Sequence, residues 1–126
     1  MRNATILMID DSAVNIDVVR STLEPFGYSI VWTHDGRLAL ELARTTLPDL
    51  VLCDIHMPGP DGFAILTALK ADSSLRCIPF VFLTATIWRG ADRRLGMALG
   101  AQRFITRPID PSVLLAEIDD CLRKAG

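Results

Sequence analysis

Short, continuous apolar runs alternate with longer segments of helical spacing along nearly the whole chain, and this alternation restricts the fold more than any other feature. Runs of this length are typical of strands that are buried on both faces of a parallel sheet. Five such runs are present, at Ala4–Ile9, Ser29–Thr33, Leu50–Cys53, Phe80–Leu83 and Phe104–Thr106.

Between these runs, apolar residues recur at steps of three and four, which predicts helices that each bury one stripe against a sheet. Gly27 and Gly100 follow the first and fourth helical segments, Pro48 follows the second, and Asp110-Pro111 begins the last. The predicted stripes are Ile16, Val19, Leu23 and Phe26; Leu38 and Leu42; Ile65 and Leu69; Ala91, Leu95 and Leu99; and Leu114, Ile118 and Cys121 or Leu122.

A strand followed by a helix, repeated five times with short connections, predicts a doubly wound α/β fold. Its five strands would form one parallel sheet, with helices on both faces and right-handed crossovers. A length of 126 residues fits a single domain spanning residues 1–126. Half of the residues are hydrophobic and 22% are charged, a balance that excludes a disordered chain or a coiled coil.

Charge and cysteine content narrow the class of protein further. The net charge of −2 argues against a nucleic-acid surface, and no polybasic patch suited to a membrane is present. The first apolar run is too short for a signal peptide or a membrane span. Cys53, Cys77 and Cys121 form no CxxC motif, so we expect three buried thiols in a reducing, cytoplasmic compartment.

Charged or hydroxyl side chains follow four of the five predicted strands. Asp10 and Asp11 follow the first strand, Asp54 the third, Thr84 the fourth and Arg107 the fifth. Ligands of open parallel sheets bind beyond the carboxyl ends of the strands, so these side chains are expected to share one site.

Three carboxylates at one edge repel each other, and at least one of them would have a raised pKa unless a cation offsets the charge. Ligation by oxygen alone suits Mg²⁺ or Mn²⁺. A metal beside a carboxylate, a hydroxyl group and a guanidinium suits phosphoryl transfer, with the carboxylate as the nucleophile. An alternative for Asp10 and Asp11 is to cap the following helix, although one acid would suffice and Ser12 is also available.

Four motifs in this order resemble the receiver domain of two-component response regulators. They are Ile9-Asp10-Asp11-Ser12, Asp54-Ile55-His56-Met57-Pro58-Gly59-Pro60-Asp61-Gly62, Leu83-Thr84-Ala85 and Phe104-Ile105-Thr106-Arg107-Pro108. Each motif alone is weak, but the resemblance extends from about Thr5 to Leu122. It implies a flavodoxin-like sheet with the strand order 2-1-3-4-5.

The resemblance also implies roles for the residues of the site. Asp54 would accept a phosphoryl group from a histidine kinase or a phosphotransfer protein. Asp11 would bind Mg²⁺ directly, Asp10 directly or through water, and His56 through its backbone carbonyl. The ring of His56 is expected to be exposed rather than to act as a base, and Asp61 to begin a helix.

Switching would involve two further positions. Thr84 would hydrogen-bond to the phosphoryl group and move toward it, and Phe104, as the switch aromatic, would then turn its ring inward. The side chains of His56 and Thr86 would tune the lifetime of the phosphoryl group. The surface around the fourth helix and the fifth strand, including the segment up to Trp88, would then bind an output domain or a partner protein.

Arg107 is a departure, because the family expects Lys at this position. Arg keeps the charge, but its planar fork is not interchangeable with an ammonium group. One alternative function is therefore a degenerate receiver that binds partners without phosphorylation. The intact set of Asp10, Asp11, Asp54 and Thr84 argues against it.

An enzyme or nucleotide binder of the same fold is the other alternative. It has no support from a Gly-rich phosphate loop, and the adjacent Asp10-Asp11 differs from the Asp-x-Asp of carboxylate phosphatases. We therefore expect a phosphoacceptor rather than an enzyme. No effector domain is evident in the chain, so its output would lie in another chain or segment, and the sequence leaves open whether it forms a homodimer.

Overall fold

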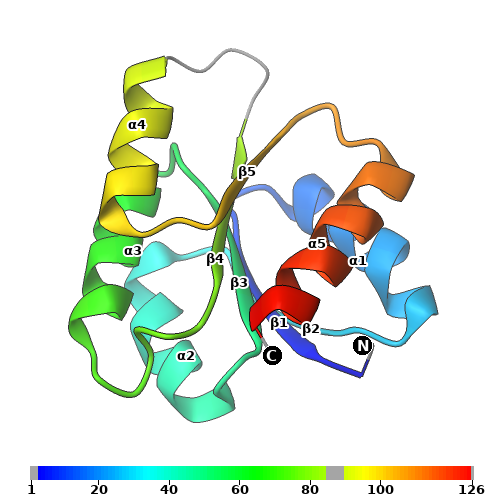
Figure 1. Cartoon of the computed structure of the whole chain (residues 1–126), viewed down its shortest axis with the longest axis horizontal. Helices are drawn as coiled ribbons and strands as arrows, with labels where there is room; N and C mark the ends of the chain where they lie inside the picture. The colour runs from blue at the N-terminus through cyan, green and yellow to red at the C-terminus, as the bar shows by residue number, and fades with distance from the viewer. Residues whose placement is uncertain (1–2, 85–89, 126) are drawn as a thin grey trace.

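The computed structural model describes residues 3–84 and 90–125, and within them all five strands lie in one sheet (Figure 1). The strand order is β2-β1-β3-β4-β5 and every pairing is parallel, which confirms the predicted doubly wound fold. The strands are β1 (Thr5–Ile9), β2 (Ser29–Thr33), β3 (Leu50–Asp54), β4 (Phe80–Thr84) and β5 (Arg103–Thr106).

Helices cover both faces of this sheet. The helices α1 and α5 pack on one face, and α2, α3 and α4 on the other (Figure 1). Their bounds are α1 (Ala13–Leu23), α2 (Ala39–Thr46), α3 (Gly62–Ala71), α4 (Gly90–Leu99) and α5 (Pro111–Ala125), with short 3₁₀ turns η1 (Glu24–Phe26) and η2 (Gly36–Leu38).

The central strands are buried on both faces, as predicted, because alternate residues enter two separate cores. Along β1, Ile6 and Met8 pack under α1 and α5, whereas Leu7 and Ile9 pack under the other helices. The prediction was wrong for the outer strands, which have one neighbour each. On β2, Trp32 is 40% exposed, and the guanidinium of Arg20 lies 4.2 Å from its ring centroid.

Three of the five predicted helix stripes are buried largely as expected: those of α1, α3 and α5. Phe26 is an exception, because it lies in η1 and is exposed. In the second helical segment Leu42 is partly buried against the core as predicted, but Leu38 is exposed, while Ala39 and Ala43 are buried. Leu38 belongs to η2, and a 3₁₀ turn does not keep the phase of the α-helix that follows.

The predicted stripe of α4 was correct at Leu99, which is partly buried against the core, and wrong at its other two positions. Ala91 and Leu95 are exposed, and Gly96 is the residue that α4 buries. A Cβ atom at Gly96 would collide with the rings of Phe104 and Phe82. Because Gly has no side chain, α4 lies against these rings, and the larger Leu95 is turned outward.

Two smaller expectations also have clear outcomes. Cys53 and Cys121 are buried free thiols, but Cys77 is exposed in the connection before β4.

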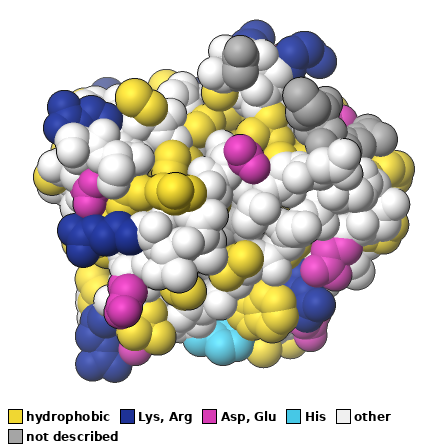
Figure 2. Space-filling view, turned by 90° about the horizontal axis from the view of Figure 1, so that it is seen from below, with side chains coloured by type: hydrophobic (Ala, Val, Ile, Leu, Met, Phe, Trp, Pro, Cys, Tyr) yellow, Lys and Arg dark blue, Asp and Glu magenta, His cyan; other side chains and the backbone are white. Residues whose placement is uncertain are grey.

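Among the described residues, no helix combines the length and the apolar character needed to cross a membrane. On the face shown in Figure 2, acidic and basic side chains intermingle with hydrophobic ones.

Candidate functional site

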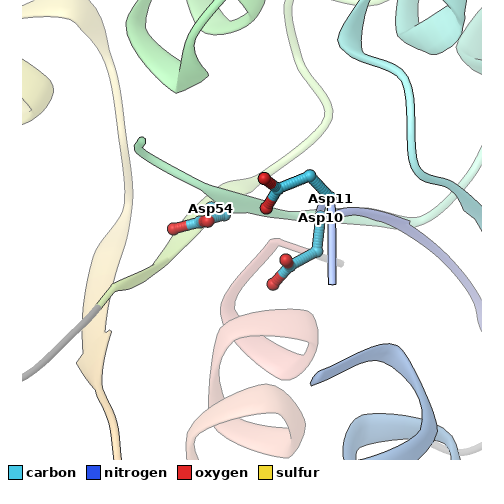
Figure 3. A group of neighbouring side chains, drawn as sticks. All are labelled: Asp10, Asp11 and Asp54. Atoms are coloured by element: carbon cyan, nitrogen blue, oxygen red, sulfur yellow. The ribbon is translucent and has the colours of Figure 1, made fainter. Parts of the chain in front are cut away.

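Three aspartates gather where β1 and β3 end (Figure 3). Ile9 is paired with Cys53 in the parallel register, so the residues that follow these two positions, Asp10 and Asp54, come next to each other at the ends of the strands. One carboxylate oxygen of each of Asp10, Asp11 and Asp54 lies within 4.8 Å of the others. Their burial differs: Asp10 is buried, Asp54 is partly buried and Asp11 is exposed.

Asp10 is held by the start of α1 and by β5. Its Oδ1 accepts a hydrogen bond from the backbone N–H of Ser12 at 2.9 Å, and its Oδ2 accepts one from Asn15 Nδ2 at 3.3 Å. Its Oδ2 also accepts from Arg107 Nη2 at 2.5 Å. Ser12 is the N-cap of α1, accepting from the backbone N–H of Asn15, which confirms that helix capping does not depend on an acid here.

Arg107 reaches across the sheet from the end of β5. Its backbone N–H donates to the carbonyl of Thr84 at 2.7 Å, which continues the pairing of β4 with β5. In the side chain, Nη1 donates to the carbonyl of Leu83 at 3.2 Å and lies 3.6 Å from Asp54 Oδ1. The guanidinium therefore contacts both Asp10 and Asp54 and offsets part of their charge.

The electrostatics of the site raise the pKa of Asp54. Burial is the largest cause, and the negative charge of Asp10 adds to it, followed by that of Asp11. Arg107 and a hydrogen bond from the backbone of His56 act in the opposite direction. A carboxylate that is costly to ionise in this position favours a site in which a further cation offsets the charge.

Two buried polar side-chain atoms at this edge have no hydrogen-bond partner in the part of the chain that the structure describes. They are Thr84 Oγ1 and Arg107 Nε. Thr84 ends β4 and is fully buried. Buried polar groups are nearly always satisfied, so these two groups are candidate donors to a ligand with oxygen acceptors.

The acidic cluster is suited to a hard divalent cation. All three side chains supply carboxylate oxygens, and none of them is a thiolate or imidazole that would select a softer metal. This donor set fits Mg²⁺ and could hold it.

His56 and Phe104 lie at the side of the site that faces α4. The side chain of His56 is 65% exposed, as expected, and its Nε2 lies 3.9 Å from Asp92 Oδ2 on α4. Phe104 is partly buried, and its ring centroid lies 5.1 Å from that of Phe82. The predicted roles of Thr86 and Trp88 fall on residues outside the described part of the chain.

Sequence reasoning missed two residues that position Asp10. Asn15 donates its side-chain amide to the carboxylate, and Nδ1 of His34 lies 3.2 Å from the backbone carbonyl of Asp10. The spacing of Ser12 and Asn15, three residues apart at a helix start, is a signal that could have pointed to Asn15. His34 approaches through the pairing of β2 with β1, which the predicted strand order already implied, but the contact of its ring with the Asp10 carbonyl has no sequence signal.

Comparison with known proteins places this chain in a family. The model of the response regulator receiver domain matches residues 6–119. The response regulator PleD of Caulobacter vibrioides is 40% identical over 121 residues, which are 96% of this chain but 26% of PleD. The polar-differentiation response regulator DivK of Brucella anthropi is 34% identical over 105 residues, covering 83% of this chain and 85% of DivK.

A solved structure agrees with these relatives. The chemotaxis protein CheY4 of Vibrio cholerae superposes with a TM-score of 0.88 at 30% identity, over 94% of this chain and 98% of that one. The likeness thus extends over both sequence and fold. The chain belongs to the response regulator receiver domain family of two-component systems.

Proposed function

We propose that residues 1–126 act as one receiver domain whose phosphoacceptor is Asp54. The observation that carries this proposal is a pair of buried donors with no partner among the described residues: Thr84 Oγ1, at the end of β4 beside β3, and Nε of Arg107, whose guanidinium reaches Asp54 from the end of β5. A phosphoryl group on Asp54 brings three acceptor oxygens, which are what these donors lack.

The reaction would use a phosphorylated histidine of a kinase or a phosphotransfer protein as the donor. A carboxylate oxygen of Asp54 attacks phosphorus while the bond from phosphorus to the imidazole nitrogen breaks, and the electron pair leaves with that nitrogen. The product on this chain is an acyl phosphate. We expect slow hydrolysis of that group and no turnover of phosphoesters.

The acidic cluster would hold Mg²⁺ (or Mn²⁺) through Asp10, Asp11, Asp54 and the backbone carbonyl of His56. When bound, the ion would offset the negative charge that builds up between the carboxylates and the phosphoryl oxygens. Arg107 contributes a second positive charge. Its contact with Asp54 supports this assignment, since Nη1 lies 3.6 Å from Oδ1.

Signal output would depend on Thr84 and Phe104. Formation of a hydrogen bond from Thr84 to the phosphoryl group would change the packing around Phe104, which already contacts Phe82 and lies against Gly96 of α4. The surface of α4 and β5 would then bind an output domain or a partner protein. We place the chain in the cytoplasm on the strength of its family.

The test is labelling by a small acyl phosphate in the presence of Mg²⁺, followed by intact mass. The wild type should gain one phosphoryl group and Asp54→Asn should gain none. Asp17→Asn is a matched control, because Asp17 is an exposed aspartate on α1. Absence of labelling, or equal labelling of Asp54→Asn, would contradict the proposal and favour a degenerate receiver.

A further inference from the structure

The carboxylate of Asp10 is already neutralised by a cation of the chain itself. Asp10 is fully buried, and its Oδ2 lies 2.5 Å from Arg107 Nη2. Its Oδ1 is occupied by the backbone N–H of Ser12. By contrast, the exposed carboxylate of Asp11 makes no hydrogen bond or ion pair with the described residues. Asp10 and Asp11 are neighbours in sequence but differ in how free they are to bind a metal.

The reach of the arginine fork explains this difference. Nη2 contacts Asp10, while Nη1 is bonded to the carbonyl of Leu83 and faces Asp54. The side chain of Arg107 is only 17% exposed, so water does little to weaken these contacts. A lysine has a compact ammonium group, and it lacks the planar fork that spreads donors over several acceptors.

A divalent cation and the guanidinium cannot both use Asp10 Oδ2 without strong repulsion between two positive groups in a buried site. We propose that Arg107 is an internal counter-cation that competes with the metal for Asp10, so that metal binding to Asp10 requires the guanidinium to withdraw. The inference rests on the metal site of the proposed function, and it makes Arg107 a residue that sets metal affinity.

The test is a double-mutant cycle on Mg²⁺ affinity, measured by titration calorimetry on the metal-free protein. The proteins are the wild type, Arg107→Gln, Asp10→Asn and the double variant. If the two side chains compete as proposed, Arg107→Gln should bind Mg²⁺ about tenfold more tightly, because a charged hydrogen bond no longer has to break. In the Asp10→Asn background the same substitution should change the affinity little.

A general effect of charge is the rival explanation, and two results would reveal it. Arg76→Gln removes the same charge from an exposed residue in the connection that precedes β4, at the other end of the sheet, and should leave the affinity unchanged. If it tightens binding as much as Arg107→Gln does, the inference is overturned. The inference is equally overturned if the gain from Arg107→Gln persists in full with Asn at position 10.

Folding of each variant is checked by thermal melting in chelator. Should Arg107→Gln fail to fold, Arg107→Lys replaces it and should give a smaller gain in affinity of the same sign. Equal Mg²⁺ affinity of the wild type and both Arg107 variants would overturn the competition while leaving the labelling of Asp54 intact. Absence of Mg²⁺ binding in every variant would instead count against the metal site of the proposed function as well.

Discussion

The two faces of the sheet are packed in different ways. Under α1 and α5 the core is almost entirely aliphatic, with Leu114 and Ile118 fully buried against β1, β3 and β4. Under α3 and α4 it contains aromatic rings, and α4 contacts them through Gly96. Close packing of large side chains from both sides makes a rigid layer. A helix that contacts the rings through a glycine makes fewer side-chain contacts with the sheet and is held less firmly. The difference predicts that changes at the site pass to α4 and β5 rather than to α1 and α5.

The largest effect is expected in the aliphatic layer. Leu114→Ala should lower the free energy of unfolding by about 3 kcal/mol, because a fully buried leucine leaves a cavity. Chemical denaturation measures the change. Val113→Ala on the same helix is the control, since Val113 is half exposed and should lose little. A loss below about 1 kcal/mol at Leu114 would show that this layer is not tightly packed.

A smaller effect is expected where α4 meets the rings. Gly96→Ala should destabilise by about 1–2 kcal/mol, because its Cβ would collide with Phe104, which outweighs the gain in helix propensity of about 1 kcal/mol. Gly90→Ala, where the nearest neighbour is the flexible end of Arg94, should not destabilise. Combining Gly96→Ala with Phe104→Leu should recover part of the loss. If Gly96→Ala is as stable as the wild type, the proposed close contact between α4 and the rings is contradicted.

Much of this architecture could be predicted from sequence, because its signals are local. Apolar runs identified the strands, and the helix starts at Asp61 and Asp110 were predicted, since both accept backbone hydrogen bonds there. Ser12, one of the candidates for the start of α1, is its cap. The gathering of Asp10, Asp11 and Asp54 followed from the shared edge of parallel strands.

The errors concern the direction in which helix residues face and the distance over which a side chain extends, and both depend on tertiary geometry. Leu38 and Leu95 fit a helical stripe, yet both are exposed, because a 3₁₀ turn changed the phase in one case and a glycine made the contact in the other. The pairing of Arg107 with Asp10 joins residues 97 positions apart. Its geometry depends on the length and fork of one side chain, for which the sequence has no periodic signal.

The smallest effect is expected at an exposed ion pair that links α2 to the end of α3. Hydrogen bonds from Ser74 and Arg44 lower the pKa of Asp72 from 3.8 to about 2. A carboxyl group whose pKa is lower in the folded chain than in the unfolded chain stabilises the folded state at pH values above its unfolded pKa. This stabilisation is lost as the pH falls toward its folded pKa. Asp72→Asn should therefore melt slightly below the wild type at pH 7, and the gap should close as pH falls from about 4 toward 2. A difference in melting temperature that stays constant with pH would show that the lowered pKa of Asp72 is not its cause.

The path from Asp54 to α4 and β5 is tested by comparing amide chemical shifts before and after phosphorylation of Asp54 by a small acyl phosphate with Mg²⁺. We expect large shifts at Thr84, Phe104 and Gly96 and little change at Leu114 and Ile118. In Asp54→Asn we expect no change beyond that caused by Mg²⁺ alone. Shifts spread equally over both faces, or a response that persists in Asp54→Asn beyond the effect of Mg²⁺, would contradict this path.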